Sequence, residues 1–419
     1  MKISEIYKLY KKHYLVDTDT RKIRKNTLFF ALKGDHFNGN KFAEKALNLG
    51  AKYAIVDEEA YRTNENFILV DNVLNTLQKL ANYHRKHLGI PIIALTGSNG
   101  KTTTKELINT VLHKKYNTVA TVGNLNNHIG VPLTLLSMTP KHEMGIVEMG
   151  ANHQKEIEFL SAICEPDYGF ITNFGKAHLE GFGGVAGVIQ GKSELYTFLK
   201  TNHKIAFVNP DDKIQIEKTK EIESIHFDLK NLKLLEVNPF LRITYKNTTI
   251  QSNLIGKYNF SNIAAAITIG TYFKVNEKAI KEAIESYIPK NNRSQIINKQ
   301  SNTIILDAYN ANPSSMKVAL ENFATLPHEN KMVILGDMFE LGTDSFTEHQ
   351  TIINLCDSLQ FSQQYFIGKN FYKCKTNKQK FETFADFENY IKKNPLKNLS
   401  ILIKGSRGMQ LERILDLIN

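Results

Sequence analysis

The sequence predicts an α/β protein with three domains, two of them built on parallel sheets. The chain has 419 residues, which is too long for one compact core because domains usually hold about 100–200 residues. Apolar runs of strand length alternate with helical patterns, and this order is typical of parallel sheets covered by helices. A glycine-rich turn near residue 100 joins an apolar strand to a helix.

Residues 1–88 are predicted to form a small N-terminal α/β domain. The apolar run Thr27–Leu32 predicts one strand, and Tyr53–Val56 predicts another. Between them a helical pattern, Lys41–Leu49, is stopped by Gly50, since glycine commonly ends helices.

Residues 89–288 are predicted to form the central domain, in which strands and helices alternate. The opening strand is Ile92–Leu95, and helical spacing follows over Thr102–Leu112. Gly145–Glu148 and Gly169–Thr172 are further buried-strand runs. The β-α-β order predicts a parallel sheet.

The end of this central unit has a different pattern. From Leu232 to Leu254 apolar and polar residues alternate without a helix, which predicts a few antiparallel strands. Two helical segments, Ser261–Tyr272 and Glu277–Tyr287, complete the unit.

Residues 289–419 are predicted to form a second doubly wound, Rossmann-like domain. Helical segments separate its predicted strands, as expected for a doubly wound sheet. These strands are Thr303–Leu306, Met332–Leu335, Tyr365–Ile367 and Ser400–Ile403.

Composition excludes several classes of protein. No apolar run approaches the length of about 20 residues that a membrane span requires, and the first residues lack the apolar core of a secretion signal. Cys164, Cys356 and Cys374 are far apart and show no metal-ligand spacing. They predict reduced thiols in the cytoplasm.

The formal net charge of +11 permits an anionic partner without identifying one. Lysine and arginine are spread along the chain, so most of them are best explained as solvated charges. No basic helix and no alternation of aromatic and basic residues suggests nucleic-acid recognition. We therefore expect no nucleic-acid partner.

The glycine-rich turn carries the sharpest functional signal. It reads Gly-Ser-Asn-Gly-Lys-Thr-Thr between a strand and a helix, the context of a P-loop whose backbone N–H groups cradle phosphates. The general motif places glycine at position 95, where this chain has Leu95, so the loop is tighter. An ordinary turn before a helix is the alternative, which the Gly-Lys-Thr triple argues against. The predicted nucleotide contacts are Gly97, Ser98, Asn99, Gly100, Lys101, Thr102 and Thr103.

Position alone does not fix the roles of three further polar residues. Glu148 ends an apolar strand, where a carboxylate can hold Mg²⁺ but can equally be an exposed strand end. His178 lies in a glycine-rich loop after a strand, although a lone loop histidine is commonly a surface residue. Lys192 lies in a helical stretch, where the default for lysine is a solvated charge.

Together these strings resemble the Mur ligases of bacterial cell-wall synthesis over nearly the whole chain. The P-loop is shared by that family and by folylpolyglutamate synthases, whereas Asn124–Pro132 and Tyr309–Met316 resemble the member that adds a terminal dipeptide. The matching strings are Asp19–Arg21, Phe29–Gly34, Gly97–Lys105, Gly123–Pro132, Val147–Asn152, Asn173–Gly183, Gly191–Glu194, Asn259, Asn262, Asp307–Pro313, Gly336–Met338 and Lys404–Met409.

The resemblance implies an ATP-dependent amide ligase that works through an acyl phosphate, with ATP and Mg²⁺ as cofactors. The implied substrates are UDP-N-acetylmuramoyl-tripeptide, whose UDP end the first domain would hold, and D-alanyl-D-alanine. The protein is expected to be a cytoplasmic monomer.

The resemblance also implies residue roles. Glu148, His178 and Lys192 would join Thr102 as Mg²⁺ ligands, Lys192 after carbamylation by CO₂, and would act in catalysis with Lys101. Further nucleotide contacts would be Asn262 to adenine, Arg293 to phosphate and Asp307 to ribose. Substrate contacts would be Thr20, Arg21, Asn124, Asn126, Asn127, Tyr309, Asn310, Asn312, Lys404 and Arg407.

Two positions depart from the family pattern. Tyr258 stands where the family has the histidine of a Gly-x-His-Asn string, which affects the local nucleotide contact. Asn38-Gly39-Asn40 replaces an Asp-Gly-His string, which affects substrate contacts near Asn40. Neither lies in the P-loop.

The sequence also leaves rival functions open. The nearest is another Mur-type amino-acid ligase or a folylpolyglutamate synthase, although an Asp-Asn-Pro-Arg string of the diamino-acid-adding relative is missing. A nucleic-acid-binding P-loop NTPase is a second rival. A catalytically silent scaffold is a third, against which Lys101, Thr102, Glu148 and His178 argue.

Overall fold

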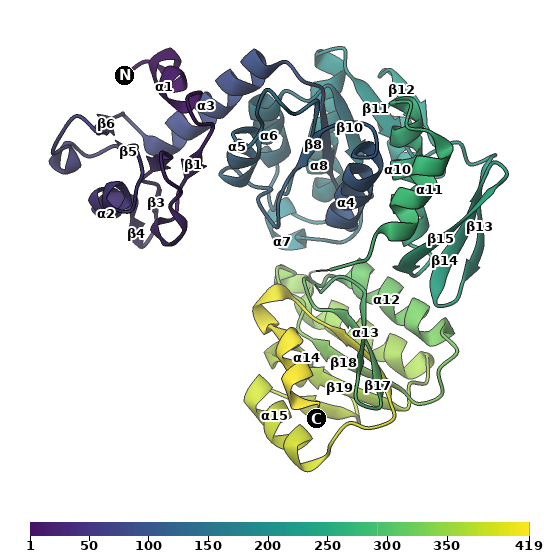
Figure 1. Ribbon diagram of the computed structural model, residues 1–419. Coiled ribbons are helices and arrows are strands. Elements are labelled where there is room, and N and C mark those ends of the chain that lie inside the picture. The colour runs from purple at the N-terminus through teal and green to yellow at the C-terminus, as the bar shows by residue number, and fades with distance from the viewer. Residues whose placement is uncertain (291, 419) are drawn as a thin grey trace.

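The computed structural model describes residues 1–290 and 292–418, which form three bodies in chain order (Figure 1). The main sheet has four strands in the first body and six in each of the other two. The three-domain α/β architecture predicted from the sequence is confirmed. The domain boundaries at residues 88 and 288 stay predictions.

The first body is built on a small parallel sheet. Its elements are α1 Ile3–Tyr10, β1 Val16–Asp17, β2 Leu28–Phe30, β3 Lys33–Gly34, β4 Phe37–Asn38, α2 Ala43–Asn48, β5 Tyr53–Val56, β6 Phe67–Leu69 and α3 Val73–Leu88. The sheet order is β1-β2-β5-β6, with all neighbours parallel. The predicted helix Lys41–Leu49 divides into a 3₁₀ turn, Gly39–Phe42, and the shorter α2.

The second body combines a parallel sheet with a small antiparallel one. Its elements are β7 Ile92–Thr96, α4 Lys101–Leu112, β8 Thr118–Ala120, α5 Gly130–Leu135, β9 Met144–Glu148, α6 Glu156–Cys164, β10 Tyr168–Ile171, α7 Leu179–Phe182, α8 Val185–Thr201, β11 Ile205–Val208, α9 Lys213–Lys218, β12 Ser224–His226, β13 Leu232–Val237, β14 Phe240–Tyr245, β15 Thr248–Ile255, α10 Asn259–Tyr272 and α11 Glu277–Ser286. The parallel order is β12-β11-β10-β7-β9-β8. The predicted antiparallel strands are β13, β14 and β15.

The third body is the second doubly wound sheet that the sequence predicts. Its elements are β16 Gln295–Lys299, β17 Asn302–Asp307, α12 Pro313–Thr325, β18 Lys331–Gly336, α13 Ser345–Ser358, β19 Gln363–Ile367, α14 Lys369–Lys373, β20 Gln379–Phe381, α15 Phe384–Lys393 and β21 Ser400–Lys404. The order is β16-β17-β21-β18-β19-β20. The sequence pattern missed edge strand β16, which pairs antiparallel with β17.

Two expectations from composition can be compared with the structure. Within residues 1–290 and 292–418, no helix combines the length and apolarity that crossing a bilayer requires. The three cysteines are free, as expected of reduced thiols, and all three are buried. Burial raises the pKa of the Cys164 thiol to about 12, so this thiol is a packing group and a poor nucleophile at neutral pH.

Arg85, near the end of α3, anchors the first body to the second. Its side chain is 9% exposed. The guanidinium donates to the carbonyl oxygens of Cys164 at 3.0 Å, Ile90 at 3.1 Å and Glu165 at 2.9 Å. It also pairs with Asp167 at 2.7 Å. Helix α3 ends close by at Gly89, whose φ of 66° is left-handed. The Arg85 side chain therefore fixes the point at which the chain passes from the first body into the second.

We expect Arg85→Ala to destabilise this junction by about 2–4 kcal/mol, because the buried carbonyl groups and Asp167 lose charged donors together. The measurement is urea unfolding followed by circular dichroism. The control is Lys86→Ala, which removes an exposed pair with Glu165 and should cost less than about 1 kcal/mol. Equal effects of the two substitutions would contradict the anchoring role.

Candidate active site

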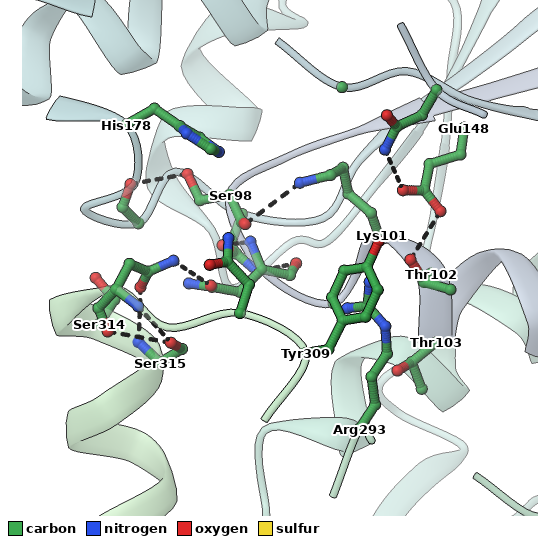
Figure 2. A pocket seen from close by; sticks show the side chains of 18 of the residues that line it. Ser98, Lys101, Thr102, Thr103, Glu148, His178, Arg293, Tyr309, Ser314 and Ser315 are labelled. Atoms are coloured by element: carbon green, nitrogen blue, oxygen red, sulfur yellow. Dashed lines mark hydrogen bonds between the residues drawn. The ribbon is translucent and has the colours of Figure 1, made fainter. Parts of the chain in front are cut away.

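A cavity of about 1040 Å³ lies between the second and third bodies. The carboxyl ends of β7, β9 and β10 face it from one body, and those of β17 and β21 face it from the other. Ligands of such sheets usually bind beyond the carboxyl ends of the strands. Figure 2 shows side chains from both bodies pointing into this space.

The loop between β7 and α4 depends on two glycines. Gly97 has a φ of 139° and Gly100 a φ of 80°, which residues with a Cβ rarely adopt. A Cβ would lie 2.0 Å from Thr172 Oγ1 at Gly97 and 2.8 Å from Asn262 Oδ1 at Gly100. The glycines therefore let the chain turn tightly and direct the N-terminus of α4 at the cavity.

Lys101 begins α4 and folds back over this loop. Its Nζ donates to the carbonyl oxygens of Gly97 at 2.7 Å and Ser98 at 3.4 Å. Burial lowers the pKa of the Lys101 ammonium; the charge of Glu148 opposes this, and that of Arg293 lowers the pKa further. Two cations close to an exposed helix N-terminus attract an anion strongly.

Glu148, at the end of β9, is 1% exposed, so the interpretation as an exposed strand end is wrong. Its Oε2 accepts a hydrogen bond from Thr102 Oγ1 at 2.9 Å, and its Oε1 accepts one from Asn126 Nδ2 at 2.8 Å. A hydroxyl and a carboxylate thus lie together beside the P-loop. Oxygen donors of this kind suit Mg²⁺.

Lys192 lies inside α8 and is 1% exposed, so the interpretation as a solvated charge is wrong. Its Nζ donates to Ala151 O at 3.0 Å and lies 4.8 Å from the centre of the Phe182 ring. Burial lowers the pKa of Lys192 well below its usual value, and the positive charge of Lys101 lowers it further. The structure therefore favours the neutral amine.

His178 belongs to a contact between the second and third bodies. It precedes α7 with a left-handed φ of 53°, and its Nδ1 is hydrogen-bonded to Glu340. In the same loop Lys176 N donates to Ser314 Oγ at 2.8 Å, and Lys176 Nζ pairs with Glu348 at 2.6 Å. The interpretation of His178 as a lone surface histidine is therefore wrong.

A hydroxyl of α4 and two amides of α10 join these helices. Asn262 Oδ1 accepts from Thr104 Oγ1 at 3.0 Å, and Asn262 Nδ2 donates to Asn259 Oδ1 at 2.7 Å. Nearby, the Tyr258 hydroxyl lies 2.7 Å from Ser294 Oγ. Tyr258, at one of the two departures from the family pattern, thus links the second body to the third.

The third body adds charged groups at neighbouring strand ends. Asp307 of β17 and Lys404 of β21 pair at 2.5 Å, and Asp307 Oδ1 accepts from Ser294 N at 3.1 Å. Arg407 pairs with Glu412 at 3.1 Å. Parallel pairing places Asp307 opposite Lys404, so the sheet register itself makes this pair.

Asn312 connects the two bodies through both atoms of its amide. Its Oδ1 caps α12 by accepting from Ser315 N at 2.9 Å, and its Nδ2 donates to Asn99 Oδ1 at 2.8 Å. The backbone oxygen of Asn99 accepts from Thr172 Oγ1 at 2.6 Å and Asn173 Nδ2 at 2.9 Å. The Asn312 side chain thus ties the P-loop to the third body.

Most residues selected from the sequence meet at this cavity. Those that line it are Ser98, Asn99, Gly100, Lys101, Thr102, Thr103, Asn124, Asn126, Asn127, Glu148, His178, Asn262, Arg293, Asp307, Tyr309, Asn310, Asn312, Lys404 and Arg407. Gly97 and Lys192 support lining residues from behind. Thr20 and Arg21 do not line the cavity, and Arg21, 86% exposed, pairs with Asp19.

Sequence reasoning missed several lining residues, among them Glu340, Ser294 and Phe159. Glu340 lies in an irregular segment after β18, and no local pattern indicates that it meets His178. Ser294 lies just before the unrecognised strand β16. Recognising that strand and its antiparallel partner could have placed Ser294 beside Asp307.

The donor set can be tested against Mg²⁺. Within the described ranges, no three or more His, Cys, Asp or Glu side chains gather into a group that could hold a metal ion. Thr102 and Glu148 fit the ion nevertheless, because Mg²⁺ usually keeps water and phosphate oxygens as its other ligands. The ligand roles of His178 and Lys192 stay predictions.

A P-loop at the end of one parallel sheet, with a second sheet facing it across a polar cavity, defines a nucleotide-binding protein of the P-loop class. Known families give a narrower assignment: "Mur ligase family, catalytic domain" matches residues 12–85, "Mur ligase middle domain" residues 95–270, and "Mur ligase, glutamate ligase domain" residues 292–407. The chain belongs to the Mur ligase family.

Relatives match along nearly the full chain. The UDP-N-acetylmuramoyl-tripeptide--D-alanyl-D-alanine ligase of Bacillus subtilis is 34% identical, covering 96% of this chain and 93% of its own. MurF from Acinetobacter baumannii superposes with a TM-score of 0.84 at 30% identity, covering 96% and 92% of the two chains. MurF ligase from Thermotoga maritima, solved in complex with ADP, gives 0.83 at 25% identity, covering 96% of both.

We expect Gly97→Ala to lower kcat/KM for ATP about 100-fold, because the new Cβ would displace the loop from its phosphate-binding geometry. Steady-state kinetics with varied ATP measures this effect. Gly89→Ala is the matched control: its φ is also positive, but no atom lies within 4 Å of the added Cβ. A Gly97→Ala protein with the wild-type kcat/KM for ATP would refute the steric argument.

Proposed function

We propose that this chain is an ATP-dependent ligase that joins D-alanyl-D-alanine to UDP-N-acetylmuramoyl-tripeptide in peptidoglycan precursor synthesis, releasing ADP and phosphate. The observation that carries the proposal is the P-loop with Lys101 and Arg293 beside it. Relatives with this activity in their names match at 31–34% identity over most of the chain, which supports the choice of substrates.

The chemistry begins with a carboxylate that an amine cannot attack, because its leaving group is too poor. Transfer of the γ-phosphoryl group from ATP to the tripeptide's terminal carboxylate oxygen creates an acyl phosphate. The loop N–H groups, Lys101 and Arg293 would stabilise the charge on the transferring group. The dipeptide amine then attacks the acyl carbon, loses a proton, and phosphate leaves as the amide bond forms.

Mg²⁺ bound beside the loop would supply charge neutralisation for the phosphates. Thr102 Oγ1 and a Glu148 oxygen are the side-chain atoms that would hold it. The hydrogen bond between them keeps both atoms next to the P-loop. Asn126 holds the second oxygen of Glu148, which orients the carboxylate.

Lys192 is proposed to carry a carbamate. The neutral amine that burial favours is the form that attacks CO₂. An N–C bond forms as one C=O π bond of CO₂ opens, the nitrogen loses a proton, and a carbamate anion replaces the neutral amine. The carboxylates of Glu156 and Glu194 lie near Lys192, and their negative charges oppose the lowering of its pKa. An anion at this depth would need a cation beside it, which Lys101 or bound Mg²⁺ would provide.

The remaining substrates would occupy the rest of the cavity and the first body. Asn310, Lys404 and Arg407, from the third body, would meet the dipeptide and the nucleotide. Thr20 and Arg21 would bind the UDP end of the second substrate. Both residues lie outside this cavity, so the nucleotide sugar would reach from the first body to the P-loop. We further propose a monomer that works in the cytoplasm, where its ATP is supplied.

A panel of amines and acceptors tests the substrate assignment. We expect ATP-dependent phosphate release only with D-alanyl-D-alanine and a UDP-N-acetylmuramoyl-tripeptide, and a product mass equal to the sum of the two substrates less one water. Lys101→Ala should reduce this release at least about 1000-fold, since charge stabilisation of the transferred group is lost. Release with a single amino acid or with glutamate and a folate would favour the rival ligases, and an active, folded Lys101→Ala protein would remove the assigned role.

For Lys192, the expected result is loss of activity in Lys192→Ala with partial recovery when a short-chain carboxylate is added, because the added carboxylate restores an anion. Activity with and without the carboxylate is the measurement. Lys200→Ala, a substitution of an exposed lysine in the same helix, is the control and should behave as wild type in both conditions. A fully active Lys192→Ala protein would remove the carbamate from the proposal.

A further inference from the structure

Arg293 is the cavity's cation with the least support from polar groups. Its Nε is buried and has no hydrogen-bond partner among residues 1–290 and 292–418. The other two cations that the third body brings to the cavity are anchored: Lys404 pairs with Asp307 and Arg407 with Glu412. A buried N–H without a partner is costly, so something else must keep Arg293 in place, or a ligand must complete it.

The ring of Tyr309 is what Arg293 rests on. The guanidinium carbon lies 3.8 Å from the ring centroid, and Figure 2 shows the two side chains together beside the P-loop. This distance is well inside the range of about 6 Å for cation–π attraction. Arg407 also approaches the ring, but at 5.7 Å.

The fold brings the two residues together through its sheet edge. Arg293 precedes β16, and Tyr309 follows β17; these strands pair antiparallel with Gln295 opposite Leu306. The end of one strand therefore meets the start of the other. Tyr309 N also donates to Asn292 O at 3.2 Å, so the ring and the guanidinium come from backbone segments that are bonded directly.

The hydroxyl of Tyr309 forms no hydrogen bond with another part of the chain that the structure describes, although the ring lines the cavity. The ring therefore has a contact and the hydroxyl has none. If Tyr309 acted on the substrate by hydrogen bonding, the hydroxyl would be the important group. If it acted through Arg293, the ring would be.

We propose that Tyr309 is a positioning residue whose ring holds the Arg293 guanidinium in the orientation that binds the phosphates of ATP. This inference rests on the proposed function, since it assigns a nucleotide to the P-loop. Stacking fixes the plane of the guanidinium without using its N–H groups as donors, so the terminal N–H groups stay available to phosphate oxygens. Tyr309 then contributes to ATP binding without hydrogen bonding to the dipeptide.

The test compares the ring with the hydroxyl. We expect Tyr309→Leu to raise the KM for ATP on the order of tenfold, with less than a twofold change in the KM for D-alanyl-D-alanine. Tyr309→Phe keeps the ring and should restore the KM for ATP to within about twofold of wild type. A rise in the dipeptide KM in Tyr309→Phe would overturn the inference, because it would show that the hydroxyl contacts the amine substrate.

A double-mutant cycle shows whether Tyr309 acts through Arg293. The effect of Tyr309→Leu on the KM for ATP should vanish when Arg293→Ala is already present. Additive effects of the two substitutions would overturn the inference. Thermal unfolding of each variant identifies loss of fold, and Tyr309→Phe stays informative if Tyr309→Leu unfolds.

Tyr372→Leu is the matched control, because Tyr372 is an exposed tyrosine of the same domain with Lys380 near its ring, 5.5 Å away. It should leave the KM for ATP unchanged. A wild-type protein that binds no ATP would remove the proposed function itself. A wild-type protein that binds ATP, combined with an additive cycle, would remove only the role of Tyr309.

Discussion

Positive charge gathered at the N-terminus of α4 is the constraint on which the rest of this structure depends. Lys101 is satisfied by carbonyl oxygens of its own loop, and Arg293 rests on an aromatic ring. Such charges repel one another, and burial makes the repulsion stronger. The sheet, the glycines and the third body hold the two cations close together. Folding therefore offsets their repulsion, and a bound anion would neutralise their charge.

The buried groups around this site follow from the same constraint. The carboxylate of Glu148 accepts hydrogen bonds from a hydroxyl and an amide, both neutral donors, and not from a lysine. Its charge therefore remains available to a cation that enters with phosphate. Lys192 lies deeper, where a cation is unfavourable next to Lys101. The interior thus selects against the form of lysine that helical surfaces normally carry.

Much of this could be predicted from the sequence, for reasons that are local. Strand β7, the turn at Gly97 and helix α4 are adjacent in the chain, and their pattern of apolar runs and glycines predicts both the fold and a phosphate site. Lys192 and Glu148 could not be placed in the same way. Helical spacing and a strand end say nothing about which face becomes buried, because burial depends on segments far away in the chain.

Edge strand β16 was missed because its short run lacks the strong apolar pattern of the central strands. With it, the neighbourhood of Arg293 and Tyr309 was missed too.

The side-chain amide of Asn312 acts in two bodies: its oxygen caps the N-terminus of α12, and its nitrogen donates to Asn99 of the P-loop. A hydrogen bond of this kind tolerates only a few tenths of an ångström of stretching before it weakens. This hydrogen bond therefore couples the position of the third body to the phosphate loop. A movement of Asn312 away from the loop would break its bond to Asn99, so the hydrogen bonding of Asn99 depends on how closely the third body approaches the second.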